Sequence, residues 1–387
     1  MPESPSLGFR AALGLVLLAS PAARGVTTRP LLPVPVASDA AALGTAPDPA
    51  HFLFAVGGDN RATGRNVPMP PTARQIFSEL RLLRPAFSLW TGDAIYGSDD
   101  TVGEAQAEYR DFLAAADQSR TPLFNAPGNH EIYDRRELEA AYGRSLGRLY
   151  GSFDYGNSHF IALDTEELGQ PIGCIGADQQ AWLQADLEAN RSAANIFVFM
   201  HHPPFPKKPY AGWADPARRD AVHRLFVQFG VKCVFAGHEH LYYKSVHDGV
   251  TYIVTGGGGA PNDAGPETGA FEHYLLVAVN GRDIGISVLE PWRLFAAAGP
   301  VSPNGSCTVR IDNYDSQNFS VVAELPTDAL GARAAAAATF TYKGTTHPVS
   351  AVIEPAFDPG TTAVRVTVPL GRSVLVSIAP AKAEPAR

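Results

Sequence analysis

The chain has 387 residues, of which 45% are hydrophobic and 18% are charged. This length and composition exclude a disordered protein and allow a sizeable core in more than one domain. The formal net charge of −8 argues against general binding to a nucleic acid backbone, which needs clustered lysine and arginine, although local positive charge can still hold a small anionic substrate.

The N-terminal segment has the layout of a secretory signal peptide. Arg10 precedes the apolar run 11–20, and small residues follow as far as Gly25. This layout predicts export, with residues 1–25 removed and the mature protein secreted or periplasmic. A membrane anchor is the alternative, but about a dozen apolar residues are too few to span a bilayer. No later stretch is long and apolar enough to be a transmembrane helix.

The sequence contains three cysteines, Cys174, Cys233 and Cys307. Because the count is odd, at least one thiol has no partner within the chain. Cys233 lies in an apolar run and is expected to be a buried free thiol. Export would permit a disulfide between Cys174 and Cys307, and the sequence leaves this pairing open.

Alternating strand and helix patterns extend from residue 51 to residue 290, after a linker at 26–50 that is rich in proline and alanine. The alternation predicts an α/β domain with short right-handed connections. The predicted strands are 52–58, 86–92, 122–128, 158–164, 195–200 and 231–236. The predicted helices are 72–83, 104–116, 135–146, 178–190 and 216–229. The last has the clearest ends, with Asp215 as the N-cap and Gly230 as the terminator.

The pattern changes after residue 250. A strand at 251–255 runs into the glycine-rich loop 256–259, and 273–290 is a predicted hairpin around Asn280-Gly281. Residues 291–305 are interpreted as a connector. Short alternating segments then predict a small all-β sandwich domain at 306–380, followed by a tail at 381–387. A contact with a surface or a partner is one role open to this second domain.

Residues of metal-ligand type follow five of the predicted strands. They are Asp59, Asp93, Asn129, His201, and the pair His238 and His240. Ligands bind outside the carboxyl ends of the strands in an open α/β sheet, so these side chains are expected to converge on one rim. Carboxylate, amide and imidazole groups together suit iron, manganese or zinc, and a set of this size suits two ions.

Five blocks of sequence carry a family resemblance. In order they are GGDNR at 57–61, GDAIY at 92–96, GNHE at 128–131, VFMH at 198–201 and GHEH at 237–240. With these blocks, the chain resembles the calcineurin-like metallophosphoesterases and, among them, the purple acid phosphatase branch. The resemblance covers about residues 52–290. It implies an α/β/β/α four-layer fold, in which a β-sandwich has helices on both sides.

The resemblance also implies a set of ligands. Asp93 would bridge two metal ions, with Asp59 and His240 on the first ion. The second ion would be held by Asn129, His201 and His238. Hydroxide activated by such a metal pair attacks phosphorus in line, and the substrate is a small phosphate ester.

One block departs from the family pattern. Many members have a histidine two residues after the first aspartate, where this chain has Arg61. The first ion then lacks a ligand unless Tyr96 supplies its phenolate, as the matching tyrosine does in purple acid phosphatases. A phenolate favours Fe(III), paired with Fe(II), Zn or Mn. If Tyr96 only packs under its loop, a Mn or Zn pair is expected. Arg61 either neutralises phosphate charge or points to solvent.

Two further histidines lie beside the ligand positions. His130 matches the outer-sphere histidine of the family, which implies a role in protonating or orienting the leaving oxygen. The alternative is a structural histidine that fixes its loop. His202 either contacts the substrate or supports the ligands.

These features predict an exported dinuclear-metal phosphoesterase that hydrolyses phosphate esters, with phosphomonoesters preferred because of the subfamily resemblance. A phosphodiesterase acting on cyclic nucleotides or phospholipid head groups would use the same metal set. A third possibility, from another class, is a surface protein that binds metal or phosphate without catalysis. The complete ligand set argues against it. The glycines at 256–259 do not form a phosphate-binding P-loop, because no Lys-Ser/Thr follows them.

Overall fold

The computed structural model describes residues 43, 45–262, 264–299, 302, 306–326, 334–356 and 358–380. The predicted signal peptide, most of the predicted linker and the C-terminal tail lie outside this part of the chain. Within it, no helix is both long enough and apolar enough to cross a membrane.

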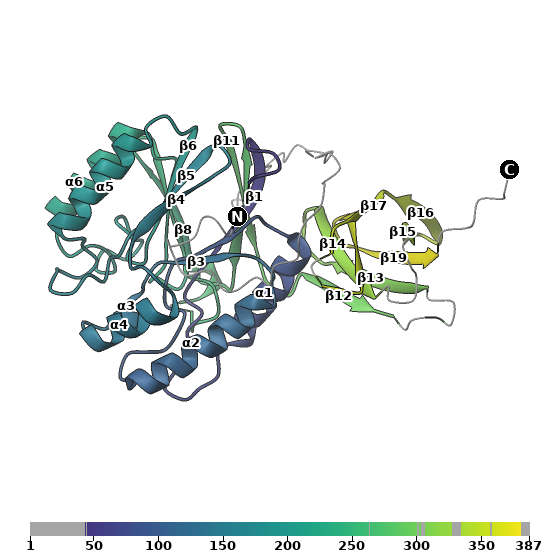
Figure 1. The fold of residues 1–387 in the computed structure, drawn as a ribbon, viewed down its shortest axis with the longest axis horizontal. Helices are drawn as coiled ribbons and strands as arrows, with labels where there is room; N and C mark the ends of the chain where they lie inside the picture. Colours follow the sequence, from purple (N-terminus) through teal and green to yellow (C-terminus); the bar gives the residue numbers. More distant parts are fainter. Residues whose placement is uncertain are drawn as a thin grey trace, which may run out of the picture.

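Two β-sheets form the centre of the larger domain (Figure 1). The first sheet has the order β11-β10-β1-β2-β3, and the second has the order β4-β5-β6-β7-β9-β8. The first comprises β1 (His51–Gly57), β2 (Ser88–Trp90), β3 (Leu123–Asn125), β10 (Tyr274–Asn280) and β11 (Asp283–Leu289). The second comprises β4 (Gly151–Tyr155), β5 (Ser158–Ala162), β6 (Asn195–Phe199), β7 (Cys233–Ala236), β8 (Tyr242–His247) and β9 (Val250–Thr255).

Aromatic rings fill the space between the two sheets. Phe54 of β1 stacks on Phe87 with a centroid distance of 5.4 Å and meets Phe197 of β6 edge-on at 5.2 Å. All three rings are fully buried. Burial of these large apolar side chains stabilises the sandwich, and their offset and edge-on geometries are those that aromatic pairs prefer. The aromatic core therefore holds the sheets face to face.

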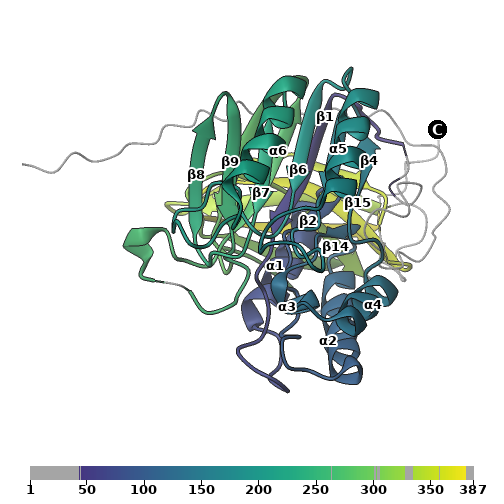
Figure 2. The same cartoon turned by 90° about the vertical axis from the view of Figure 1, so that its left-hand side faces the viewer.

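Helices cover both outer faces of this sandwich (Figures 1 and 2). The first sheet is covered by α1 (Pro71–Leu83), α2 (Val102–Asp117), α3 (Asn129–Ile132) and α4 (Arg136–Ser145). The second is covered by α5 (Ala177–Ala189) and α6 (Pro216–Phe229). The α/β/β/α four-layer prediction is confirmed. The predicted ends of α6 are also confirmed, because Asp215 accepts from the backbone N–H of Ala217 at 2.9 Å and Gly230 has φ 68°.

The strands that precede the candidate ligands belong to two different sheets. The sequence pattern predicted that all of these ligands follow strands of a single open sheet, and this was wrong. Asp59, Asp93 and Asn129 follow β1, β2 and β3 of the first sheet. His201 and His238 follow β6 and β7 of the second. Strands are parallel within each of these sets. Packing the two sheets face to face brings both sets of carboxyl ends to the same place.

A smaller β-sandwich forms the C-terminal domain (Figure 1). Its sheets have the orders β12-β13-β19-β15-β16 and β14-β18-β17. The strands are β12 (Leu294–Ala298), β13 (Cys307–Asn313), β14 (Phe319–Pro326), β15 (Ala334–Tyr342), β16 (Thr345–Val349), β17 (Ala351–Glu354), β18 (Thr361–Val368) and β19 (Arg372–Pro380).

The predicted connector at 291–305 is partly a strand. β12 lies inside it and pairs antiparallel with β13, with Leu294 opposite Asn313. The sequence LFAAA has a low intrinsic preference for strands, so tertiary pairing rather than local propensity determines this element. The smaller domain therefore begins earlier than the sequence pattern indicates.

The two domains meet where α1 packs against β14. Arg84, at the end of α1, pairs with Glu324 of β14 at 2.5 Å, and their side chains are only 10% and 8% exposed. Arg81 makes a second contact to Glu324 at 2.8 Å. Apolar residues of both domains belong to one continuous buried cluster. The interface is therefore a packed and charged contact.

All three cysteines are buried free thiols. Cys174 packs beneath α5 and α6, whereas Cys307 belongs to the core shared with the smaller domain. These different locations exclude the disulfide between Cys174 and Cys307 that the sequence left open. The prediction of a buried free thiol at Cys233 is confirmed.

Candidate dinuclear metal centre

Three of the candidate ligands follow a glycine and have a left-handed backbone. Asp59, Asp93 and His238 have φ angles of 55°, 53° and 70°. Such angles are uncommon outside glycine and tend to occur at functional sites, where packing over-determines the backbone. A Cβ on Gly237 would lie 2.2 Å from Oδ2 of Asp59, so only glycine allows this approach of the two loops.

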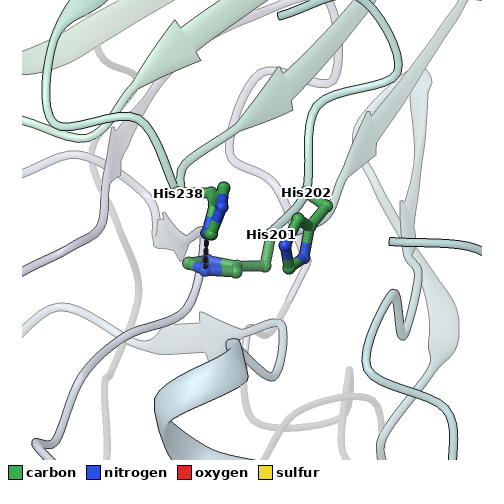
Figure 3. A group of neighbouring side chains, drawn as sticks. All are labelled: His201, His202 and His238. Atoms are coloured by element: carbon green, nitrogen blue, oxygen red, sulfur yellow. Dashed lines mark hydrogen bonds between the residues drawn. The ribbon is translucent and has the colours of Figure 1, made fainter. Parts of the chain in front are cut away.

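The structure brings five of the six predicted ligands, together with His202, into two neighbouring groups. Potential ligand atoms of Asp59, Asp93 and His240 lie within 4.8 Å of one another, and so do those of His201, His202 and His238. Figure 3 shows the three histidines, which come from the loops after β6 and β7. The groups are joined because Nε2 of His201 lies 3.4 Å from Oδ1 of Asp93.

Acceptor atoms converge in the histidine group. Nδ1 of His201 donates to the carbonyl of Thr91 at 2.8 Å, so in the neutral ring Nε2 carries a lone pair. This Nε2 lies 2.9 Å from Oδ1 of Asn129 and 3.3 Å from Nδ1 of His238. Burial and the neighbouring histidines lower the pKa of His238 to about 2. Neutral imidazoles and an amide oxygen that point at one spot suit a cation.

The carboxylate group also fits a cation. Oδ2 of Asp59 is buried and has no hydrogen-bond partner within the described part of the chain. Burial and the nearby Asp93 raise the pKa of Asp59 well above its ordinary value. Burial acts on Asp93 in the same direction, but His201 and other neighbours hold the pKa of Asp93 below its ordinary value. A bound cation would remove the cost of burying two ionised carboxylates so close together.

Buried polar side chains hold the ligand loops in place. Glu131 is fully buried, and its carboxylate accepts from the backbone N–H groups of Asp93, Ala94 and Gly128 at 3.0, 2.6 and 2.7 Å. This single carboxylate therefore connects the loop of Asp93 to the loop of Asn129. Glu131 was assigned no role from the sequence, although its position three residues after Gly128 is the spacing of a capping box.

The glycine-rich loop 256–259 packs against the loop of Asp59. The N–H of Gly258 donates to the carbonyl of Gly58 at 2.9 Å, and the N–H of Ala260 donates to the carbonyl of Asp59 at 2.8 Å. A Cβ on Gly258 would lie 2.2 Å from the carbonyl oxygen of Gly58. These glycines therefore permit close backbone packing, in agreement with the exclusion of a P-loop.

His130 and Tyr96 lie together at the edge of the centre. Nδ1 of His130 contacts the carbonyl oxygen of Tyr96 at 2.5 Å and Oγ of Ser98 at 2.6 Å. The two rings are 5.7 Å apart, and Tyr96 is half-buried. Burial lowers the pKa of His130, although Asp93 acts in the opposite direction. The ligand role of Tyr96 stays a prediction.

Arg61 and His202 each contact one acidic side chain. Nε of Arg61 donates to Oδ2 of Asp93 at 3.3 Å, so this arginine faces the centre rather than solvent. Nδ1 of His202 contacts Glu166 at 2.5 Å. Burial lowers the pKa of His202 to about 4 and raises the pKa of Glu166 to about 8. A ring nitrogen of His202 is close enough to His201 and His238 for the three rings to hold one metal ion.

A cavity of about 360 Å³ opens onto this centre. It is lined by Arg61, Asp93, Asn129, His130, Lys208, Tyr210, Ala211, His238, Glu239 and His240. The loop after β6 supplies Lys208, Tyr210 and Ala211, which the sequence analysis missed. The carboxylate of Glu239 accepts from the backbone N–H groups of Lys207 and Lys208 at 2.7 and 2.8 Å. Glu239 thus fixes this loop over the site.

Residues 69–242 match the family described as Calcineurin-like phosphoesterase. They form a calcineurin-like metallophosphoesterase domain. The matched segment of the domain includes Asp93, Asn129, His201, His238 and His240. Asp59 precedes the matched segment and joins the site through β1.

Known proteins similar to the phosphoesterase domain include phosphatases and a phosphodiesterase. Purple acid phosphatase 15 of Arabidopsis thaliana is 32% identical over 36% of this chain and 30% of its own length. A probable cyclic nucleotide phosphodiesterase of Xenorhabdus bovienii is 28% identical over 42% of this chain and 67% of its own length. A solved dimetal phosphatase of Danio rerio has a TM-score of 0.48 and 19% identity, covering 63% of this chain and all of that one.

The chain spans only part of the purple acid phosphatases that it matches. The shared region is 30% of purple acid phosphatase 15 and 35% of purple acid phosphatase 23, both of Arabidopsis thaliana. The similarity therefore covers about a third of each relative rather than its whole length.

Proposed function

We propose that this protein is a dinuclear-metal phosphoesterase that hydrolyses small phosphomonoesters. The observation that carries the proposal is the convergence of Asp59, Asp93 and His240 with His201, His238 and Asn129. Two neighbouring groups of oxygen and nitrogen ligands are the arrangement that a pair of cations requires. Iron, manganese and zinc suit these ligands, and Fe(III) is included if Tyr96 supplies a phenolate.

The bound cations would supply charge neutralisation at the phosphoryl group and a water of lowered pKa. Asp93 belongs to the carboxylate group and lies 3.4 Å from His201 of the histidine group, so it would help to hold both ions. Asn129, His201 and His238 would hold one ion, whereas Asp59 and His240 would hold the other. Asn129, His238 and His240 line the cavity, so the ester and water can reach this centre.

The remaining residues of the cavity would bind and orient the ester. Arg61 lies beside Asp93 and can donate to a phosphoryl oxygen. Nδ1 of His130 is engaged by the carbonyl of Tyr96, so Nε2 is the atom available to hold a proton for the leaving oxygen. His202 is kept in place by Glu166 and supports His238, whose ring centroid is 3.9 Å away.

A comparison of two chromogenic substrates tests the proposed reaction. Purified protein supplied in turn with Fe, Mn and Zn is assayed with p-nitrophenyl phosphate and bis(p-nitrophenyl) phosphate. We expect faster turnover of the monoester, and loss of that activity in the Asn129→Ala variant. Absence of turnover with every metal would instead support a binding protein without catalysis.

Visible absorption of the iron-loaded protein that disappears in Tyr96→Phe would assign the phenolate ligand.

Diester hydrolysis is the second candidate. The similarity to a protein named as a cyclic nucleotide phosphodiesterase favours it, and the same ligand set would serve both reactions. Faster turnover of bis(p-nitrophenyl) phosphate than of the monoester would select this alternative.

We also propose that the protein is exported. The basic and apolar N-terminal layout of residues 1–25 supports this proposal. N-terminal sequencing of protein recovered from outside the cytoplasm should begin after residue 23 or 25, and a chain that begins at Met1 would contradict export with cleavage.

A further inference from the structure

Lys208 occupies a position in the cavity that the proposed hydrolysis does not use. Arg61 enters the cavity from the loop after β1, and Lys208 enters it from the loop after β6 in the other sheet. Arg61 contacts Asp93 and therefore lies beside the metal centre. Tyr210, two residues after Lys208, also lines the cavity but is 84% exposed. The loop that contains Lys208 thus also reaches solvent.

The backbone at Lys208 is held in place by Glu239. Glu239 is 1% exposed, and its two oxygens accept from the N–H groups of Lys207 and Lys208. Glu239 lies between His238 and His240 in the sequence. The position of Lys208 is therefore tied directly to the loop that carries two of the candidate ligands.

The cavity has room for more than one phosphate group. Its volume of about 360 Å³ falls in the range of roughly 300–1,000 Å³ that is typical of small-molecule sites. The candidate metal centre, Arg61 and His130 can satisfy a phosphoryl group at one end of this space. Lys208 lines the same cavity and adds a cation within reach of the rest of the ester. An ammonium group binds a phosphate as a compact point charge.

We propose that Lys208 is a specificity-determining residue that binds a second phosphate on the leaving group. The inference rests on the proposed phosphoesterase function. It predicts that the preferred substrates are phosphate esters or anhydrides whose leaving group itself carries a phosphate. Lys207 offers a matched control, because its backbone N–H also bonds Glu239 while its Nζ donates to the carbonyl of Thr268. Lys207 is not among the residues that line the cavity.

Calorimetric binding of two non-hydrolysable anions to the Mn-loaded, full-length protein tests the inference. Methylphosphonate has one phosphonate group and methylenediphosphonate has two, so the pair differs mainly in the second anionic group. We expect Lys208→Ala to weaken the diphosphonate about tenfold, as for loss of one charge-assisted hydrogen bond. Binding of the monophosphonate should change less than about twofold. Lys208→Arg should restore most of the difference, and Lys207→Ala should behave like the wild type.

Two results would overturn the inference. If Lys208→Ala weakens the binding of both anions equally, the lysine contacts the scissile phosphate instead. If it weakens the binding of neither anion, the lysine does not take part in substrate binding. Metal content measured before and after each titration excludes extraction of the ions by the diphosphonate. Turnover of p-nitrophenyl phosphate by the wild type decides the proposed function separately, because it does not depend on a second phosphate.

Discussion

Oδ1 of Asn129 lies 2.9 Å from Nε2 of His201, although the two residues follow strands of different sheets. Asn129 follows β3 of the first sheet, and His201 follows β6 of the second. No backbone pairing connects these strands, so the contact depends on the aromatic core that packs one sheet on the other. The candidate metal centre therefore lies where the two sheets meet, and bound metal ions would connect the two sheets.

Metal removal should destabilise the fold. The ligand side chains converge and carry no positive charge of their own. A cation that binds only the folded state adds stability by mass action. With metal at about a thousand times its dissociation constant, the gain is about 4 kcal/mol. Thermal unfolding with and without a chelator measures it. A melting temperature that is unchanged by chelation and by added Mn, Zn or Fe would contradict the site.

Glu131→Ala should lower the free energy of unfolding by about 3 kcal/mol or more. The substitution leaves the buried N–H groups of Asp93, Ala94 and Gly128 without their acceptor, and each unpaired donor costs roughly 1–3 kcal/mol. Denaturant unfolding measures the loss. Glu137→Ala is the control, because Glu137 is 53% exposed and pairs with Arg135 at the surface. If the two substitutions lowered the free energy of unfolding equally, the proposed role of Glu131 in holding the two ligand loops together would be contradicted.

His159 should make stability depend on pH. Its Nδ1 contacts Asp154 at 2.7 Å and its Nε2 contacts Asp186 at 2.8 Å. Burial alone would lower the pKa of His159, but the two carboxylates outweigh burial and raise it above the ordinary value. The protonated ring therefore stabilises the folded state fully below the unfolded pKa, and this stability is lost as the pH rises through the higher folded pKa.

The variant His159→Gln isolates this contribution. Its loss of stability relative to the wild type should be larger at pH 5.5 than at pH 9, as measured by denaturant unfolding. A difference that is the same at both pH values would show that His159 acts through packing alone.

Arg84→Ala should loosen the domain interface. The Arg84–Glu324 pair is nearly buried, and removal of one partner from a buried ion pair costs about 3–5 kcal/mol. Arg74→Ala is the control, because Arg74 pairs with Asp111 at 2.8 Å where both side chains are at least 40% exposed. That pair should contribute less than about 1 kcal/mol. Calorimetry should show a lower transition for Arg84→Ala only, and a shift of equal size in both variants would refute the prediction.

The sequence predicted the ligand loops because their signals are local. Asp59, Asp93 and His238 each follow an apolar run and a glycine, so the strand, the turn and the polar residue can all be recognised within about ten residues. Asp215 and Gly230 fixed the ends of α6 in the same way. Such short-range patterns reflect backbone geometry and solvent exclusion, which act on neighbouring residues.

The features that the sequence did not predict depend on contacts between distant segments. The assignment of the ligand strands to two sheets arises from interdigitating rings such as Phe54 and Phe197, whose partners no local pattern identifies. Lys208 reaches the cavity because Glu239, 31 residues later in the chain, binds its backbone. The lysine pair at 207–208 in a proline-rich loop was the available signal, but its location needed the fold. β12 is another example, because only its pairing with β13 makes it a strand.

Metal content is the most direct test of the central claim. Elemental analysis of the purified protein and of its Asp93→Ala variant, with circular dichroism as a check on folding, measures whether the converging side chains hold two ions. We expect about two equivalents of Fe, Mn or Zn in the wild type, and a folded Asp93→Ala protein that has lost metal and phosphatase activity together. A wild-type protein that binds no metal, or an Asp93→Ala variant that remains active without it, would contradict the account.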